Sequence, residues 1–536
     1  MLLVWLGVLL AVAVGPIDYH MQPSWSVLII VGFGVALFCL ACQTGIVLSS
    51  AWLLRRGPLQ PLQHKPLSVT VVVASLLGLA GIGMIAVDRV MLSGVNNNSY
   101  AALLRCAPEL IDYIETKRTF LIYVGYLIFS FGFSSLALFF LLGEKLRGWP
   151  AALAQLSILS PVGYALLYSG RTPILLMIAL IVSICLVRLA QRKTLFPSGH
   201  HLVIKTIVFA ALFMVYTNMM WSARQSFCIR MSGVVEELRS RVNEQAARAL
   251  TDAQMRKAEV LRELAESNLV GEEKRKLERQ LAIIDQEVAA TRGNEMRGSV
   301  DTETLNRMIE RRIHSSGSEK QVQSNQSDFD RFVAIMWEAW HVQPRGYVIS
   351  AVDSHLFSEK AAQGSLSNYF YLTHSVRIID MIWHARDNLT PLWGVYEVGI
   401  ISPILRIFFP HNQLIASMNT QLRSTQVYGF YPSAWGAAYL DFGKLGAILY
   451  IVLWGFLGGV GFYGSRRSTL ATPPLILTFV FASILLSPLQ GPLGISNSAL
   501  VLVSMLIVGL VVDYRTLTQS RASLIADDMN LNTSAP

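Results

Sequence analysis

The sequence predicts an all-α, polytopic membrane protein with about ten transmembrane helices. The chain is 53% hydrophobic and 15% charged and has a mean hydropathy of +0.46, which is more apolar than an ordinary soluble chain. Seven apolar segments precede a connection of more than two hundred residues, and three follow it. Basic residues flank these segments in an alternating pattern. The aqueous parts are therefore a minority of the chain, and the long connection is the largest of them.

Nine apolar stretches have roughly the 17 to 25 residues that a helix needs to cross a bilayer. They lie near residues 24–54, 67–87, 119–143, 150–169, 172–189, 202–221, 447–463, 472–488 and 494–513. A tenth, shorter stretch at Leu2–Val14 lacks the basic residues that begin a signal peptide. We interpret it as an uncleaved first helix. A signal peptide ending before Gly15 is the alternative, and it leaves the later topology unchanged.

The charges of the short connections predict the orientation. Every second connection is basic, and the residues concerned are Arg55, Arg56, Lys65, Lys145, Arg147, Arg188, Arg192, Lys193, Lys205, Arg466 and Arg467. The positive-inside rule places these residues and both termini in the cytoplasm. The other connections then lie outside, at Pro16–Gln22, Asp88–Arg118, the turn at Arg171, Trp221–Gly446 and the turn around Gln490. The net charge of +9 is thus mostly cytoplasmic anchoring, which argues against a nucleic-acid partner.

These features divide the chain into five regions. They are a seven-helix membrane bundle (1–221), a helical hairpin insertion with its linker (222–327), an outer, interfacial loop (328–446), three C-terminal membrane helices (447–513) and a cytoplasmic tail (514–536).

The insertion is dense in charged residues and carries narrow apolar stripes at helical spacing. The stripes are Val235, Leu238 and Val242 in the first half, and Leu277, Leu281, Ile284 and Val288 in the second. A break near Asn268–Gly271 would let the two helices fold back on each other. We interpret residues 232–322 as a hairpin for protein contact or spacing, with a chain-length regulator as the candidate partner. A solvated rod that is satisfied by its own contacts is the alternative.

The outer loop after Asp328 is rich in aromatic residues, arginine and histidine, which is typical of segments at a membrane interface. Within it, Pro391–Pro410 is apolar but interrupted by Glu397 and Arg406, which favours a re-entrant or interfacial element over a full span.

One predicted helix of this loop, Ser375–Ala385, presents a cation, a carboxylate and an imidazole on one face. Arg377, Asp380 and His384 stand at positions i, i+3 and i+7, and His374 and Arg386 flank them. Such a set can bind an anionic leaving group while the imidazole or carboxylate accepts a proton from a hydroxyl. A solvated helix face with an ion pair is the alternative.

Arg171 lies in the turn Tyr168-Ser169-Gly170-Arg171-Thr172-Pro173, between two spans. An arginine at the end of two membrane helices is costly unless it meets water or an anion, and its planar fork suits phosphate or diphosphate. Snorkelling to lipid headgroups is the alternative.

The loop ends in two short motifs, Gly429-Phe430-Tyr431-Pro432-Ser433 and Tyr439-Leu440-Asp441-Phe442-Gly443-Lys444-Leu445-Gly446. Pro432 and Ser433 suit the start of a helix, and the glycines permit close packing. A purely structural helix start explains the glycines more readily than it explains Asp441 at the membrane border.

The Tyr439–Gly446 pattern, the Ser-Gly-Arg-Thr turn and the large outer loop before the last helices resemble the Wzy-type oligosaccharide repeat-unit polymerases, which make the O-antigens and exopolysaccharides of bacterial envelopes. The resemblance covers the whole architecture except residues 231–325.

This resemblance implies a GT-C-like, inverting glycosyltransferase of the bacterial inner membrane. Such an enzyme transfers a growing glycan from undecaprenyl diphosphate to an incoming lipid-linked repeat unit on the periplasmic side. It uses no nucleotide sugar or metal. The sequence has neither a glycine-rich phosphate loop nor metal ligands at recognisable spacing.

The resemblance assigns three roles to residues of this chain. The base is one of His374, His384 and Asp441. The diphosphate ligands are Arg171 and Arg377, with Arg345, Arg386 or Arg423 as further candidates. The side chains expected to stack on sugar rings are Tyr428, Tyr431 and Trp435, although anchoring at the interface accounts for these aromatics equally well.

The sequence leaves two rival functions open. An O-antigen ligase shares the lipid-diphosphate donor, and His411-Asn412 resembles the start of its histidine motif, but the paired glycines expected about ten residues later are missing. A flippase or a membrane assembly or sensor protein would place charge along a path inside the bundle. This chain concentrates its charge outside.

Overall fold

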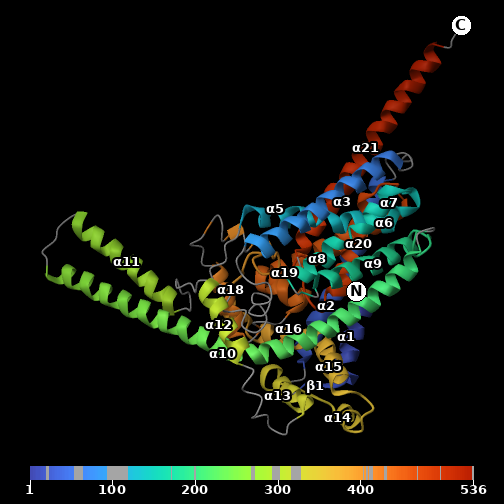
Figure 1. Cartoon of the computed structure of the whole chain (residues 1–536). Helices are drawn as coiled ribbons and strands as arrows, with labels where there is room; N and C mark the ends of the chain where they lie inside the picture. The colour runs from blue at the N-terminus through green and yellow to red at the C-terminus, as the bar shows by residue number, and fades with distance from the viewer. Residues whose placement is uncertain are drawn as a thin grey trace. The chain divides into compact units, whose positions relative to one another are not determined.

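The structure is a computed structural model of the whole chain (Figure 1). It describes all residues except 20–22, 54–63, 93–118, 169, 171, 198–200, 267–271, 293–301, 316–326, 402–403, 406–408, 410–413, 426, 428–430, 468, 495–496 and 534–536. The described residues form helices and one small two-stranded sheet. The chain divides into two compact units: Met1–Ala86, Phe120–Asn218 and Gln326–Pro536 form the first, and Val87–Thr119 and Met219–Asn325 form the second.

Among the described residues, seven helical segments are long and apolar enough to cross a membrane, which confirms an all-α, multi-pass membrane protein. They are Trp25–Ala51, Pro66–Val87, Phe120–Lys145, Trp149–Leu167, Thr172–Ala190, Ser433–Arg467 and Ser498–Thr518. The three other predicted spans appear as shorter apolar helices, Leu2–Val14, Leu202–Phe213 and Thr472–Leu486. Because the backbone of a membrane span must satisfy its own hydrogen bonds, an apolar stretch of this length folds as a helix.

Most helices of the membrane region keep the bounds expected from hydropathy within a few residues, but α19 begins at Ser433 rather than near residue 447, and α21 continues to Thr533 rather than ending near residue 513. In chain order they are α1 (Leu2–Val14), α2 (Trp25–Leu53), α3 (His64–Val87), α5 (Phe120–Phe129), α6 (Phe131–Leu142), α7 (Trp149–Leu156), α8 (Leu159–Leu167), α9 (Thr172–Ala190), α19 (Ser433–Arg467), α20 (Thr472–Leu486) and α21 (Ser498–Thr533). Short π and 3-10 turns at Asp88–Leu92 and Gly143–Lys145 follow α3 and α6.

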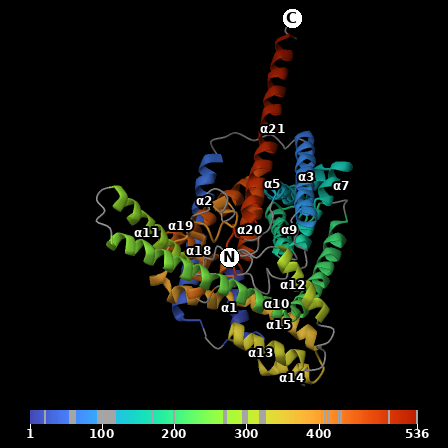
Figure 2. The same ribbon diagram turned by 60° about the vertical axis from the view of Figure 1, so that its left-hand side comes forward.

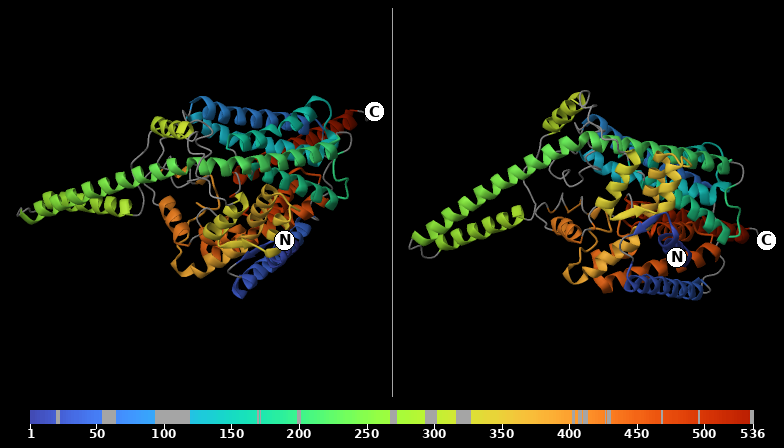
Figure 3. Two further views of the ribbon diagram at one scale, coloured as in Figure 1. Left: turned by 60° about the horizontal axis from the view of Figure 1, so that its bottom comes forward. Right: turned by 90° about the horizontal axis from the view of Figure 1, so that it is seen from below.

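Helix α10 (Leu202–Glu266) does not end near Trp221, where the apolar stretch ends. Its sequence has no proline and is dense in Ala, Leu, Arg and Glu, so the backbone continues as helix after the hydropathy changes. In the second unit, α11 (Glu272–Arg292) runs back along α10, and α12 (Thr302–Ser315) follows it (Figure 3). Ile284 and Val288 of α11 pack on Ala253 of α10, and Lys257 pairs with Asp285.

The most extensive helix pair of the first unit is α2 with α19, and glycines let these helices touch backbone to backbone. A Cβ atom at Gly45 would lie 2.4 Å from the carbonyl oxygen of Phe456, and one at Gly459 would lie 2.0 Å from that of Cys42. Such contacts exclude any side chain at either position. The two helices therefore form a tightly packed frame.

The described residues of Ile17–Tyr19 and 328–424, called the outer part below, join this frame through strands and helices. Strand β1 (Ile17–Tyr19) pairs antiparallel with β2 (Val342–Pro344). Helices α13 (Asp328–Trp340), α14 (Gly346–Asp353), α15 (Glu359–Thr373), α16 (Ser375–His384) and α18 (Leu414–Ser424), with a 3-10 turn at Arg386–Asn388, complete it (Figure 2). Ser327 and Asp330 form a capping box that fixes the start of α13.

Candidate functional site

Helix α16 carries the predicted site residues Arg377 and His384 together with Asp380, and it forms over the range that the sequence predicts. Its apolar face packs into a cluster with α1, α2 and α19. This cluster consists of Trp5, Val27, Val31, Val35, Val376, Ile379 and Trp435. The helix is amphipathic, so burying Val376 and Ile379 turns His384 toward the exposed side, while Asp380, one turn after Val376, stands at the edge of the buried face. The packing thus fixes where the polar side chains stand.

Asp380 links helix α16, on which it lies, to the start of α2. Its Oδ1 accepts a hydrogen bond from Ser24 Oγ at 2.6 Å, and its Oδ2 accepts one from the Ser24 backbone N–H at 3.4 Å, directly before α2. His384 Nε2 lies 3.4 Å from the same Oδ1. The Asp380 side chain is 15% exposed, whereas that of His384 is 69% exposed. A carboxylate thus orients an accessible imidazole, which is the arrangement expected of a general base and its orienting group.

His374 is enclosed where α15 meets α16. Its ring stacks on Phe370 with centroids 5.0 Å apart, and Nδ1 lies 2.8 Å from the carbonyl oxygen of Phe370. Burial lowers the pKa of His374 to about 4, although contacts with backbone groups, including one of Tyr431, act against that shift. The ring is therefore neutral at ordinary pH. Its 1% exposure makes it less accessible to a substrate hydroxyl than His384 is.

Arg377 and Tyr431 lie beside His374. Arg377 follows one helical turn later on α16, and partial burial lowers the pKa of its guanidinium. Tyr431 lies 6.4 Å from Tyr371, whose ring is in turn 6.0 Å from that of His374, centroid to centroid. The fold thus brings three predicted site residues together.

Asp441 is the third predicted base, and its carboxylate binds backbone groups. It is fully buried, and it accepts hydrogen bonds from the backbone N–H groups of Gly394, Tyr396 and Glu397. These bonds fix the turn that follows α16 against the start of α19. Asp441 therefore has a structural role that explains an acid at this border, with no oxygen exposed to a substrate.

Gly443 follows two residues later and kinks α19. Its φ of 62° and ψ of −169° belong to a region that essentially only glycine adopts. Together with Asp441 it accounts for much of the Tyr439–Gly446 motif by local geometry.

Glu397 is a buried acid to which the sequence alone assigned no role. Its Oε1 accepts hydrogen bonds from Tyr450 Oη at 2.6 Å and from the Leu493 N–H at 3.1 Å. Its Oε2 makes no hydrogen bond among the described residues and occupies the space above Gly491, where a Cβ would lie 1.8 Å from it. The signal in the sequence was the interruption of an apolar stretch by this one carboxylate.

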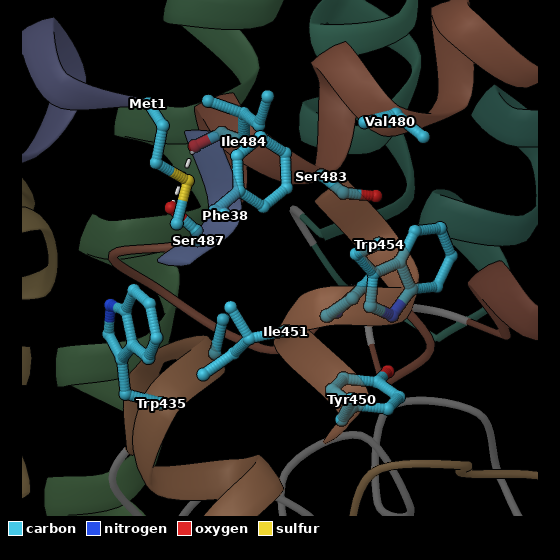
Figure 4. Close-up of a pocket in the computed structure, with 12 residues that line it drawn as sticks. Met1, Phe38, Trp435, Tyr450, Ile451, Trp454, Val480, Ser483, Ile484 and Ser487 are labelled. Carbon is cyan, nitrogen blue, oxygen red and sulfur yellow. Dashed lines mark hydrogen bonds between the residues drawn. The ribbon is translucent and has the colours of Figure 1, made fainter. Parts of the chain in front are cut away.

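A cavity of about 430 Å³, including its opening to solvent, is lined in part by Tyr450, the tyrosine that donates to Glu397 (Figure 4). Its walls come from α2, α19, α20 and the turn that follows α20. Phe38, Trp435, Ile451, Trp454, Val480 and Ile484 supply apolar surface. Tyr450 lines the cavity and also donates to Glu397, so it connects the apolar space with the buried carboxyl.

Raising the pH is expected to destabilise the folded protein through Glu397. Burial raises the pKa of this carboxyl from 4.5 to about 8. Below pH 4.5 it is protonated in both the folded and the unfolded chain. Between pH 4.5 and about 8 the unfolded chain releases the proton and the folded chain retains it, so stability falls by on the order of 5 kcal/mol and then levels off.

Glu397→Gln should therefore flatten the decrease in melting temperature between pH 5 and 8, measured by tryptophan fluorescence in detergent. Asp387→Asn, at a carboxyl that is 82% exposed, is the matched control and should follow the wild-type curve. Parallel curves for Glu397→Gln and wild type would contradict this assignment.

The remaining predicted residues are distributed over the outer part and the start of α19. Arg345 Nη2 donates to the Ala13 carbonyl oxygen at 2.7 Å, at the end of α1. Arg386 lies over the ring of Trp383 and donates to its carbonyl oxygen at 3.0 Å. Trp435 is buried against Trp5, with ring centroids 6.1 Å apart.

Several predicted site residues fall where the structure describes no side chain. Arg171, Tyr428 and the His411-Asn412 pair lie outside the described residues, and so does the side chain of Arg423. Among the residues that are described, no group of three or more His, Cys, Asp or Glu side chains could hold a metal ion.

Comparison with known proteins assigns no family. No protein-family model matches the chain, and neither a curated protein nor a solved structure matches it.

Proposed function

We propose that this protein is a bacterial inner-membrane glycosyltransferase that polymerises lipid-linked oligosaccharide repeat units on the periplasmic face. The motif resemblance and the multi-pass helical architecture support this function. The single observation that favours chemistry in the outer loop is the pair of Asp380 and His384, which stand one and two helical turns after Arg377 on α16. A base beside a cation is what transfer from a diphosphate to a hydroxyl requires.

In the proposed reaction His384 accepts the proton from a sugar hydroxyl of the incoming unit. The hydroxyl oxygen forms a bond to the anomeric carbon of the growing glycan, and the bond from that carbon to the diphosphate oxygen breaks. The electron pair leaves with the diphosphate, whose charge Arg377 and Arg171 offset. The leaving group is already an anion stabilised by arginine, so no acid is needed to protonate it. His374 would keep the start of α16 in place as a neutral, buried ring.

The proposed function is tested by deleting the gene in its host and analysing the lipid-linked and surface glycans by gel and mass spectrometry. Single repeat units without long polymer, restored by wild type but not by Arg171→Ala, are the expected result. Finished polymer trapped on undecaprenyl diphosphate would identify a ligase instead. Unchanged glycans would reject the glycosyltransferase, and the flippase or sensor alternatives would then be tested. Full polymer from Arg171→Ala would reject the role of that residue alone.

We also propose that the hairpin of α10 and α11 contacts a chain-length regulator. Its apolar seam is buried between α10 and α11, so the surface that it offers to a partner is the charged one. Deleting residues 232–322 should change polymer length on a gel while leaving polymer present. Polymer of unchanged length and amount would remove this partner.

A further inference from the structure

Three tyrosines meet where α5 and α8 come together, and sequence reasoning had assigned none of them a role. Tyr126 lies on α5, while Tyr164 and Tyr168 lie at the end of α8. The ring centroids of Tyr164 and Tyr168 are 4.8 Å apart, and Tyr126 lies 6.1 Å from the first and 6.2 Å from the second. The hydroxyl groups of Tyr126 and Tyr168 are hydrogen-bonded to each other. We refer to Tyr126, Tyr164 and Tyr168 as the tyrosine cluster.

The tyrosine cluster packs on the main hydrophobic core and is partly exposed. Phe129, which is completely buried, stacks on Tyr164 with centroids 4.7 Å apart and joins the cluster to the main hydrophobic core. The three tyrosines are themselves only half-buried. Their rings are therefore held in place by the core while part of their surface stays available for a ligand.

Asn497 supplies a second polar group at the same place. Its Nδ2 donates to Tyr164 Oη at 3.2 Å, and its backbone adopts a left-handed conformation with φ of 61° directly before α21. An amide side chain offers two donors and an acceptor, and each phenol offers one donor and accepts as well. An aromatic surface with hydroxyl and amide groups beside it can pack on the apolar face of a ligand and pair with its polar groups.

The composition of this site matches a sugar ring better than it matches the alternatives. A sugar has apolar C–H faces that pack on aromatic rings and hydroxyls that pair with phenols and amides. Tyrosines that only anchor a protein at the membrane interface direct their rings to lipid. These three pack against one another and on Phe129.

One turn connects the tyrosine cluster with the buried acid described above. The segment between α20 and α21 carries Leu493, whose N–H binds Glu397, and four residues later Asn497, which binds Tyr164. In the sequence, Tyr168 also stands three residues before Arg171. The segment between α20 and α21 thus connects the tyrosine cluster with Glu397, in the region where we propose that the transfer takes place.

We infer that Tyr126, Tyr164, Tyr168 and Asn497 form a carbohydrate-binding subsite that holds a sugar ring of the oligosaccharide substrate. This inference rests on the proposed function for the source of the sugar. The site contributes binding and orientation only. No bond forms or breaks at these residues.

The test measures binding of oligosaccharide fragments released by mild acid from the host's surface polysaccharide. The full-length protein in nanodiscs is titrated with them by saturation-transfer difference NMR. The double variant Tyr164→Ala/Tyr168→Ala should bind about tenfold more weakly or worse, because two stacking rings are removed. Tyr164→Phe and Asn497→Ala keep the rings and remove hydroxyl or amide contacts, so each should weaken binding a few-fold. Tyr514→Ala, at a tyrosine on α21 that is 70% exposed, should bind like wild type.

Unchanged affinity in the double variant, or no binding by wild type, would overturn the subsite. If the double variant fails to fold, as judged by size-exclusion profile and melting temperature, Tyr164→Phe and Asn497→Ala decide in its place, and wild-type affinity in both would overturn the subsite. The glycan analysis of the deletion strain is independent of these measurements. A polymerase phenotype with unchanged fragment binding would therefore reject the subsite and leave the proposed function intact.

Discussion

His384→Ala is expected to lower polymer synthesis by about 10²- to 10⁴-fold, the contribution of a positioned general base. His384 is the accessible member of the three predicted bases, with a side chain that is 69% exposed, and Asp380 orients it from 3.4 Å. His374 and Asp441 are buried, at 1% and 0% exposure. The measurement is the initial rate of chain extension on purified lipid-linked repeat units in nanodiscs.

The matched control for this variant is another exposed histidine of the outer part. His355 has a left-handed backbone with φ of 58°, so asparagine, which tolerates that conformation, is the suitable replacement. His355→Asn should keep the wild-type rate. A wild-type rate from His384→Ala would exclude this residue as the base, and a rate that falls only with His374→Ala would transfer the role to the buried imidazole.

Arg188→Ala is expected to destabilise the membrane bundle by about 1–3 kcal/mol for each buried carbonyl group that loses its donor. Arg188 is fully buried and forms an ion pair with Glu144. It also donates to the carbonyl oxygens of Leu141 at 2.8 Å and Thr194 at 2.7 Å. Its removal leaves carbonyl groups at the end of α6 without a donor.

The measurement is the yield and melting temperature of the purified protein in detergent. Arg192→Ala, at an exposed arginine four residues later, is the control and should match wild type. Arg188→Lys should be intermediate, because an ammonium cannot reproduce the planar fork of the guanidinium. Wild-type stability in Arg188→Ala would show that these contacts contribute little to folding.

The sequence predicted the membrane helices well because hydropathy and helix length are local properties. In a bilayer, an apolar stretch has to satisfy its backbone groups within itself, so α2, α9 and α20 follow from composition alone. Helix α16 was equally predictable, because its apolar and polar positions repeat at helical spacing over ten residues. The continuation of α10 beyond Trp221 was missed because the hydropathy changes there while the helix propensity does not.

The roles of individual polar residues depended on contacts between distant parts of the chain. Asp441 and Gly394 are joined by a hydrogen bond, as are Glu397 and Tyr450, and sequence spacing carries no information about such pairs. The carboxylate of Asp441, a predicted base, therefore accepts hydrogen bonds from backbone N–H groups. Glu397 is a buried acid whose pKa is raised by burial.

The sequence by itself determined that this protein is a helical, multi-pass membrane protein and which helix carries Arg377, Asp380 and His384. The tertiary structure alone decided which of these side chains is accessible, and that Tyr126, Tyr164 and Asn497 meet. The physical reason is that hydropathy acts along the chain, whereas burial, hydrogen bonding and ring packing depend on which segments become neighbours in space.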